Sequence, residues 1–297
     1  MVNIKRLKKG KLTYYYLQHT IRVGPKVVTK QIYLGKKLPK NIEEINHDFL
    51  RKLYMNEWYP VLDQIKSRYS KEIKQMPPSS RIKEMKIFAT RFTYNTQRIE
   101  GSKLTFRETT NLLERGVTPS REKSADDIIE ARAHEKVFYE MLKHKRKDLT
   151  LDIILDWHCK LFRETKADIS GRIRKHQIGI SGSKFIPPLY VEIFPMLREF
   201  FIWYNKNKSK IHPAELAALA HLKFVTIHPF ADGNGRVSRL MMNFVLTKNG
   251  YPMFDIKYEN RNRYYTSLEK AQIKKTEGTF VRWFMKSYIR DQKQYKD

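Results

Sequence analysis

Residues 228–239 read His228-Pro229-Phe230-Ala231-Asp232-Gly233-Asn234-Gly235-Arg236-Val237-Ser238-Arg239, between two apolar runs of helical character at 214–227 and 236–248. Gly233 and Gly235 let the loop turn several backbone N–H groups toward one point, where the N-terminus of the following helix adds partial positive charge. Arg236 and Arg239 are three residues apart, so they share a face of that helix and can reach the same anion. The stretch is therefore expected to bind an anion such as phosphate.

Two further side chains of the stretch suggest chemistry on that anion. Asp232 would be free to hold Mg²⁺ beside the phosphates, and the imidazole of His228 would be free to take a proton from a hydroxyl. Taken singly, His-Pro is usually a turn, Gly-Asn-Gly a tight loop, and arginines at a helix start are usually solvated. Their combination at this spacing predicts a functional site.

The stretch resembles the signature of the Fic family, His-Pro-Phe-x-Asp/Asn-Gly-Asn-Gly-Arg-x-x-Arg, and matches it at every specified position. The resemblance implies a mainly α-helical domain that transfers a nucleotide monophosphate, usually AMP from ATP. The acceptor would be a Tyr, Thr or Ser hydroxyl of a target protein or of the enzyme itself. The cofactor would be Mg²⁺, with ATP as substrate.

The resemblance also implies a role for each matched residue. The general base would be His228, the Mg²⁺ ligand Asp232, and the anion hole Gly233, Asn234 and Gly235, with Arg236 beside the β-phosphate and Arg239 beside the γ-phosphate. Tyr264 and Tyr265 match aromatic positions that lie near the adenine in the family. Core packing is an equal alternative for either ring.

A second motif lies upstream, at the end of a helix predicted over about residues 80–101. Thr96-Gln97-Arg98-Ile99-Glu100-Gly101 matches the Ser/Thr-x-x-x-Glu-Gly/Asn motif of Fic proteins that carry an internal inhibitory helix. By itself the stretch would be an ordinary helix end, since glycine commonly ends helices. With the signature present, it implies that Glu100 pairs with Arg239 and inhibits the enzyme, within a motif formed by Thr96, Glu100 and Gly101.

Residues 177–188 alternate apolar and polar side chains around a Ser-Gly-Ser tip, which predicts a β-hairpin. In the Fic family a hairpin at this place is the flap that holds the target segment as an added strand, and Ile178, Ile180 and Phe185 would then face the target. Any two-stranded excursion from a helical domain would give a similar pattern, so a purely structural hairpin is an equal alternative.

The N-terminal part of the chain differs from the remainder. Residues 11–35 contain two β-rich runs around Gly24-Pro25 and predict a hairpin. Asn41 is positioned to cap a long helix over about 42–73, which Pro77-Pro78 would end. We therefore expect an N-terminal hairpin plus helix at 1–78 and a Fic domain at 79–297.

Composition restricts the remaining choices. The chain has 297 residues, of which 41% are hydrophobic, and no apolar run long enough to cross a bilayer, so we expect a globular cytoplasmic protein without a membrane partner. The 59 basic and 31 acidic residues give a net charge of +28, with basic residues in nearly every segment. This charge reflects either biased composition or binding to an acidic partner or nucleic acid. A homodimer is a further possibility.

Several alternative functions stay open at this point. Members of the family can transfer UMP, phosphocholine or phosphate, or remove AMP from a modified protein with help from the inhibitory glutamate. Gly233 and Gly235 argue against the phosphate-transferring branch, whose loop replaces glycine with bulkier residues. From a different class, the positive charge allows a nucleic-acid-binding module on an inactive Fic scaffold.

Overall fold

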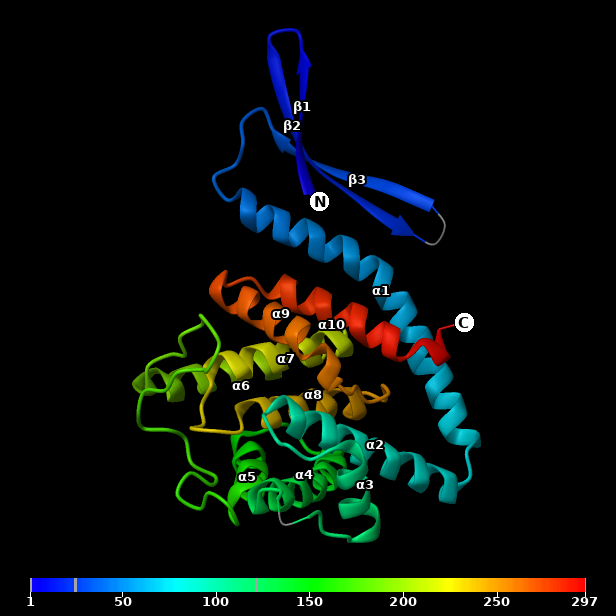
Figure 1. Cartoon of the computed structure of the whole chain (residues 1–297). Coiled ribbons are helices and arrows are strands. Elements are labelled where there is room, and N and C mark those ends of the chain that lie inside the picture. The colour runs from blue at the N-terminus through cyan, green and yellow to red at the C-terminus, as the bar shows by residue number, and fades with distance from the viewer. Residues whose placement is uncertain (1, 24–25, 121, 297) are drawn as a thin grey trace. The chain divides into compact units, whose positions relative to one another are not determined.

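The computed structural model describes residues 2–23, 26–120 and 122–296, and within them the chain is mainly helical (Figure 1). The strands are β1 (Val2–Lys9), β2 (Leu12–Val23) and β3 (Lys26–Gly35). The α-helices are α1 (Ile42–Gln75), α2 (Pro78–Ile99), α3 (Phe106–Arg115), α4 (Ala125–Lys143), α5 (Leu151–Phe162), α6 (Ile193–Asn207), α7 (Pro213–Ile227), α8 (Asn234–Lys248), α9 (Arg261–Ile273) and α10 (Glu277–Asp291). Short 3₁₀ helices lie at His144–Arg146 (η1), Tyr190–Glu192 (η2), Tyr258–Asn260 (η3) and Lys293–Tyr295 (η4).

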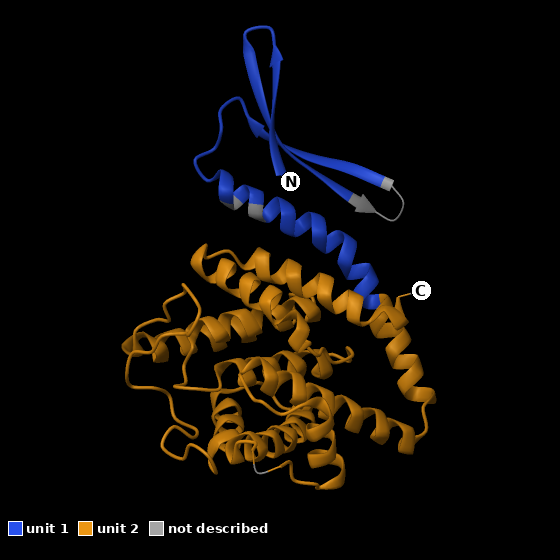
Figure 2. Ribbon diagram, viewed as in Figure 1, with its two compact units in different colours: residues 1–63 blue, residues 64–297 orange. Residues whose placement is uncertain are grey.

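The chain divides into two compact units, residues 1–63 and 64–297, and the division falls within α1 (Figure 2). The domain boundary expected after residue 78 stays a prediction. Unit 1 contains the three strands and the first part of α1. Unit 2 contains all the other helices of the described chain.

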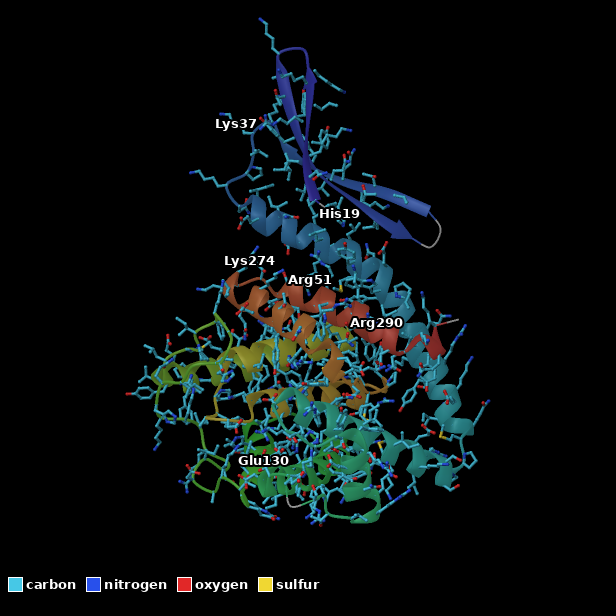
Figure 3. The ribbon with its side chains drawn as sticks, viewed as in Figure 1. His19, Lys37, Arg51, Glu130, Lys274 and Arg290 are labelled. Carbon is cyan, nitrogen blue, oxygen red and sulfur yellow. The ribbon has the colours of Figure 1, made fainter. Side chains whose placement is uncertain are left out.

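The sheet of unit 1 has the order β1-β2-β3, with both pairs antiparallel. The predicted hairpin corresponds to β2 and β3, whereas β1 was not predicted because most of its side chains are polar and exposed, without clear alternation. Leu17, His19 and Ile21 alternate along β2 as buried residues, and His19 Nε2 lies 2.9 Å from the hydroxyl of Tyr54 on α1 (Figure 3). One face of the sheet therefore packs on α1. Gly24 and Pro25, at the expected turn, lie outside the described residues.

The centre of unit 2 is the pair α7 and α8. Helices α9 and α10 lie on one side of this pair, and α2, α4 and α5 lie on the other (Figure 1). Nearly every side chain of α7 and α8 is buried, polar ones included, as expected for helices enclosed on all sides. Because tightly packed helices hold their ends in place, the loop between α7 and α8 has a rigid frame.

The chain enters and leaves α7 through defined caps. Pro213 occupies the first turn, where its missing N–H costs nothing, and His212 Nδ1 accepts a hydrogen bond from the Ala214 N–H at 3.2 Å. At the other end His228 adopts a left-handed conformation with φ of 53°. A non-glycine residue in this region is uncommon and is held there by its surroundings. Helix α7 therefore ends abruptly at the first residue of the signature.

The predicted hairpin at residues 177–188 is not formed as paired strands. The described segment is irregular, with a turn in which the Ser183 N–H donates to the Ile180 carbonyl at 3.1 Å. A side chain satisfies a backbone group that strand pairing would otherwise satisfy, since Gln177 Nε2 donates to the Pro187 carbonyl at 3.1 Å.

No helix in the described residues is both long enough and apolar enough to span a membrane.

Candidate active site

His228 is oriented by its own backbone and by the end of α7. Its Nδ1 lies 3.1 Å from the Val225 carbonyl, so Nδ1 carries the proton and Nε2 keeps the lone pair. Arg174 Nε donates to the His228 carbonyl at 2.9 Å, which fixes the backbone of the residue. Burial lowers the pKa of His228, and the bond to Val225 only partly opposes that shift. The imidazole is therefore neutral and able to accept a proton near neutral pH.

The loop after His228 is braced by Asn234. Its side chain accepts from the Phe230 N–H at 2.9 Å and donates to the Phe230 carbonyl at 2.8 Å. The buried Phe230 ring stacks on His158, with ring centroids 3.8 Å apart. His158 Nδ1 accepts the Gly171 N–H at 2.9 Å, so its Nε2 donates to the Asp232 carbonyl at 3.0 Å. The Phe230 side chain thus points inward, and the Asn234 side chain holds the backbone of the loop in place.

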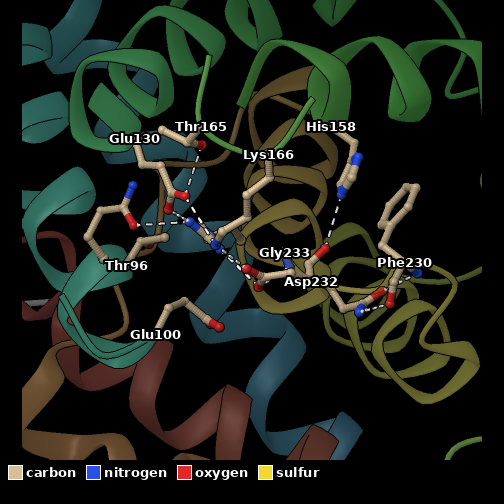
Figure 4. A network of polar contacts seen from close by, with 12 residues as sticks. Thr96, Glu100, Glu130, His158, Thr165, Lys166, Phe230, Asp232 and Gly233 are labelled. Atoms are coloured by element: carbon tan, nitrogen blue, oxygen red, sulfur yellow. Dashed lines mark hydrogen bonds and ion pairs between the residues drawn. The ribbon is translucent and has the colours of Figure 1, made fainter. Parts of the chain in front are cut away.

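Asp232 lies between two cations. Lys166 Nζ is 2.6 Å from its Oδ2, and Arg236 Nη2 is 3.0 Å from its Oδ1 (Figure 4). Burial would raise the pKa of Asp232, but the charges of Arg236 and Lys166 outweigh it and bring the pKa to about 2. The carboxylate is therefore ionised at physiological pH.

A buried glutamate links the same cations. Glu130 on α4 contacts Arg236 Nη1, and its other oxygen lies 3.2 Å from Lys166 Nζ and from the Thr165 hydroxyl (Figure 4). Arg236 also lies over the Phe162 ring, 4.4 Å from its centroid. Glu130, Lys166 and His158 were not predicted from the sequence. Glu130 and His158 are polar residues on otherwise apolar faces of α4 and α5, and this break in the apolar pattern is the sequence feature that could have identified them.

The predicted ion pair between Glu100 and Arg239 is confirmed. Arg239 Nη2 lies 2.5 Å from Glu100 Oε1, and the Arg239 side chain is only 1% exposed. Burial would lower the pKa of Arg239, but Glu100 raises it, so the guanidinium stays charged. Thr96 holds the same guanidinium through its hydroxyl and its carbonyl, both at 3.3 Å. Gly101, with φ of 103°, ends this helix in a conformation that suits glycine.

The two glycines of the signature differ in what surrounds them. Gly233 has φ of 83°, and a methyl group added there would collide with the Phe162 ring. A methyl group on Gly235 would meet Glu100 Oε1, the end of a side chain that can shift. The Glu100 carboxylate thus lies against the first turn of α8. An anion is favoured in this place because unpaired N–H groups and the helix dipole converge there.

The two tyrosines have different surroundings. The buried Tyr264 hydroxyl lies 3.0 Å from His221 Nε2 and 3.5 Å from Arg239 Nη1. Tyr265 is 44% exposed, and its hydroxyl donates to the Ile99 carbonyl at 2.8 Å, one residue before Glu100. The contacts of Tyr264 are those of a core residue. Tyr265 is bonded to the end of the predicted inhibitory helix, and adenine contact stays a prediction for both.

The segment predicted as the flap is tied to the signature loop by Arg174. Besides the His228 carbonyl, its guanidinium donates to the carbonyls of His176 at 2.9 Å and Pro188 at 2.7 Å. At the tip, the Lys184 N–H donates to Glu269 on α9 at 2.6 Å. The predicted target-facing side chains, Ile178, Ile180 and Phe185, are all half-buried. Contact with a target stays a prediction for all three.

Comparison with known proteins places these residues in a family. Residues 148–246, which include the whole signature, match the Fic/DOC family. Protein adenylyltransferase fic-1 of Caenorhabditis elegans is 32% identical over 186 residues, which are 61% of this chain and 36% of that protein. Protein adenylyltransferase Fic of Drosophila melanogaster is 34% identical over 181 residues, with 60% and 36% covered. The chain thus spans about a third of the length of these curated relatives.

Two solved structures are similar over more of the chain. A Fic domain containing signaling protein of Bacteroides thetaiotaomicron superposes with a TM-score of 0.70 at 27% identity, over 79% of this chain and 95% of that one. A Fic-1 fragment of C. elegans superposes with a TM-score of 0.72 at 25% identity, over 88% and 78%. Together with the matched signature, these similarities show that residues 148–246 match the Fic/DOC family and that the chain shares the fold of the two solved structures.

Proposed function

We propose that this chain transfers AMP from ATP to a hydroxyl side chain of a target protein, and that Glu100 holds it in an inhibited resting state. The observation that carries the proposal is the position of the Glu100 carboxylate. It pairs with the buried Arg239 and lies against Gly235 at the first turn of α8. A carboxylate there stands in for a phosphate group of the nucleotide.

The reaction is an in-line displacement at the α-phosphorus. The target hydroxyl oxygen forms the new P–O bond, its proton passes to His228 Nε2, and the bond to pyrophosphate breaks. The Val225 carbonyl holds His228 Nδ1, so Nε2 is the nitrogen left to accept the proton. A positioned base of this kind contributes about 10² to 10⁴ in rate.

The remaining residues act by positioning and by neutralising charge. The backbone N–H groups at the start of α8, together with Arg236 and a released Arg239, would bind the triphosphate oxygens. Arg236 is fixed in advance by Glu130 and Asp232, so little reorganisation is needed when the nucleotide arrives. Phosphoryl-group chemistry depends mainly on such positioning and charge.

The residues present fit Mg²⁺. Asp232 is ionised, and within the described chain its Oδ2 contacts the partly exposed Lys166. Mg²⁺ suits such a site because it commonly uses one or two carboxylates, substrate phosphates and water. When bound, it would neutralise charge on the phosphates. Asp232 would hold it after Lys166 moves away.

Intact-protein mass spectrometry tests the proposal. Incubation with ATP and Mg²⁺ should add one adenylyl group to the Glu100→Gly chain through self-modification, and His228→Ala in the same background should add none while still binding ATP. UTP in place of ATP tests the nucleotide. An unmodified Glu100→Gly chain that binds ATP and lacks activity on any lysate protein would refute the proposal. A cytoplasmic location and a homodimer stay predictions.

A further inference from the structure

Basic residues occur in nearly every segment of the chain, but the excess of basic over acidic residues is largest near the N-terminus. Residues 1–42 contain 11 Lys and Arg and no Asp or Glu, the first acidic residue being Glu43. This stretch includes the entire sheet of unit 1. A sheet with no carboxylates on any of its strands has no internal partners for its cations, so its field favours a polyanion.

One face of this sheet packs on α1 through Leu17, His19 and Ile21, and the other face we call the open face. Strand register assigns its members, which are Asn3, Lys5, Leu7, Lys9, Leu12, Tyr14, Tyr16, Gln18, Thr20, Val27, Thr29, Gln31 and Tyr33. None of them is buried, and Tyr33 is 53% exposed. The open face is therefore available to a ligand.

A row of amides crosses the open face. Asn3 pairs with Gln18, and Gln18 pairs with Gln31, so one amide comes from each strand. Within the described chain these three side chains make no hydrogen bond of their own, whereas the adjacent Thr20 and Thr29 hydroxyls bond to each other at 3.0 Å. Amide side chains are the donors and acceptors that read base edges, above all adenine, in the major groove.

The charges lie at the margins of the sheet. From Leu12 to Ile21 the central strand carries no Lys, Arg, Asp or Glu, and its open-face side chains are leucine, tyrosine, glutamine and threonine. On the open face, Lys5 and Lys9 lie on the edge strand β1, whereas Lys30 on β3 pairs with His19 and belongs to the face that packs on α1. Lys37, in the loop after β3, extends into solvent (Figure 3). The uncharged polar groups thus have cations beside them on β1 and, past the end of β3, at Lys37.

We propose that the open face binds duplex DNA in the major groove. Three strands spaced about 4.8 Å apart give a backbone width of roughly 10 Å, and the major groove is about 12 Å wide. In this placement the central strand meets the base edges, while Lys5 and Lys9 on β1 meet the phosphates on one side and Lys37 after β3 those on the other. Tyr14, Tyr16 and Tyr33 cluster at one end, with ring centroids 5.3 and 6.2 Å apart, and offer hydroxyls and ring edges to sugar and thymine methyl groups.

Duplex DNA fits these features better than the other anionic partners. The major groove of A-form RNA is too narrow and deep for side chains to read. An acidic protein would be bound by the lysines but would leave the uncharged amide row without a matching pattern of donors and acceptors. The proposal concerns unit 1 alone, and its test requires neither ATP nor transferase activity.

The test measures fluorescence anisotropy of a labelled mixed-sequence DNA duplex of roughly two helical turns, titrated with the full chain. Gln18→Glu places one negative charge in the amide row, and Gln75→Glu, on the exposed end of α1 in unit 2, makes the same charge change elsewhere. We expect Gln18→Glu to weaken binding about tenfold and Gln75→Glu to leave it nearly unchanged. Lys5→Gln should reduce the slope of log affinity against log salt by about 0.9.

Three results would overturn the assignment. Absence of binding at about 50 mM salt would exclude DNA as the ligand. Equal losses for Gln18→Glu and Gln75→Glu would mean a diffuse electrostatic attraction with no role for the open face. Tighter binding to single-stranded RNA of the same sequence, or displacement of the duplex by polyglutamate as effective as by unlabelled DNA, would assign the face to RNA or to acidic protein. Circular dichroism of each variant confirms that the fold is retained.

Discussion

His228 can act as a base only while its imidazole is neutral. Burial lowers its pKa below the ordinary value of 6.5, and protonation at low pH removes the lone pair that accepts the proton. Activity should therefore be constant through neutral pH and fall only below about pH 6.5. The pH profile of kcat/KM in the Glu100→Gly background measures this acid limb. A limb centred above pH 7 would mean that another group supplies the base.

Lys166 is the more exposed of the two cations that contact Asp232. Its side chain is 37% exposed on the loop after α5, whereas Arg236 on the other oxygen of Asp232 is 3% exposed and held by Glu130. A metal ion must displace Lys166 to reach Asp232 Oδ2. Lys166→Met should therefore tighten binding of Mn²⁺ without nucleotide, roughly fivefold for the loss of one partly exposed ion pair.

Electron paramagnetic resonance of Mn²⁺ measures that affinity. Lys160→Met serves as the matched control, because Lys160 lies 2.8 Å from both Glu140 and Asp156 and makes no bond to Asp232. The control should bind Mn²⁺ as the unchanged chain does. Equal or weaker affinity in Lys166→Met would show that the lysine does not compete with the metal.

Single residues were predictable where a contiguous motif defined them. The signature and Thr96–Gly101 predicted the Glu100–Arg239 ion pair, since both partners belong to recognisable motifs. Glu130 and Lys166 come from α4 and from the loop after α5, so only the fold brings them to Asp232. Their roles depend on contacts between distant segments, which spacing along the sequence does not reveal.

Among the elements, α2 positions Glu100, which is the residue that caps the C-terminal end of this helix. The Tyr265 hydroxyl donates to the Ile99 carbonyl at 2.8 Å and so restrains the last turn of that helix. One such bond contributes about 0.5–1.5 kcal/mol. Tyr265→Phe removes it but keeps the ring, and should raise basal AMP transfer a few fold, less than Glu100→Gly does, with KM for ATP unchanged.

Steady-state kinetics separates this role from adenine binding. Tyr69→Phe, on α1, provides the same chemical change away from Glu100. A raised KM for ATP with unaltered basal transfer in Tyr265→Phe would instead make Tyr265 a nucleotide contact, as the sequence suggests. Equal effects of both substitutions would indicate a general change in stability.

Helices were predictable because their signals are local. Thr105 and Glu108 form a capping box at the start of α3, a pattern that four consecutive residues specify, and Gly116 ends that helix in the left-handed conformation. The predicted hairpin at 177–188 failed because alternation of apolar residues does not fix strand pairing. There, Arg174, Gln177 and Glu269 satisfy the backbone groups that a ladder would have used.

At the scale of the whole molecule, two buried histidines link stability to pH. His134 and His221 are fully buried, and burial lowers the pKa of each to about 3. Unfolded histidine takes up its proton near pH 6.5, so the unfolded state binds more protons between about pH 6.5 and 3. The stability that these two histidines contribute is thus fully present above pH 6.5 and is lost as the pH falls from 6.5 toward 3.

Each histidine should lower the free energy of unfolding by about 2 kcal/mol between pH 7 and pH 5. Chemical denaturation at the two pH values measures the loss. His134→Gln should remove about half of the loss of unfolding free energy that His134 and His221 together cause, even if the variant is less stable than the unchanged chain at pH 7. A free energy of unfolding that does not change between pH 7 and 5 would contradict the burial of neutral histidines.

The central claim is that the folded molecule rests with its nucleotide site occupied by its own carboxylate. Glu100→Gly removes that carboxylate and frees Arg239 for the triphosphate. Because misplacement by about 1 Å can cost on the order of 10²-fold in rate, release should raise transfer by a similar factor. The AMP transfer rate of Glu100→Asp should lie between those of the unchanged chain and of Glu100→Gly, because the shorter aspartate side chain reaches Arg239 less well.

The most direct test is transfer of labelled AMP from ATP and Mg²⁺ by the unchanged chain and by Glu100→Gly at equal concentration. Calorimetric ATP binding and circular dichroism provide controls for occupancy and folding. We predict self-modification of Glu100→Gly at about 10² times the rate of the unchanged chain. A variant that is folded and binds ATP, yet transfers AMP no faster than the unchanged chain, would contradict the claim.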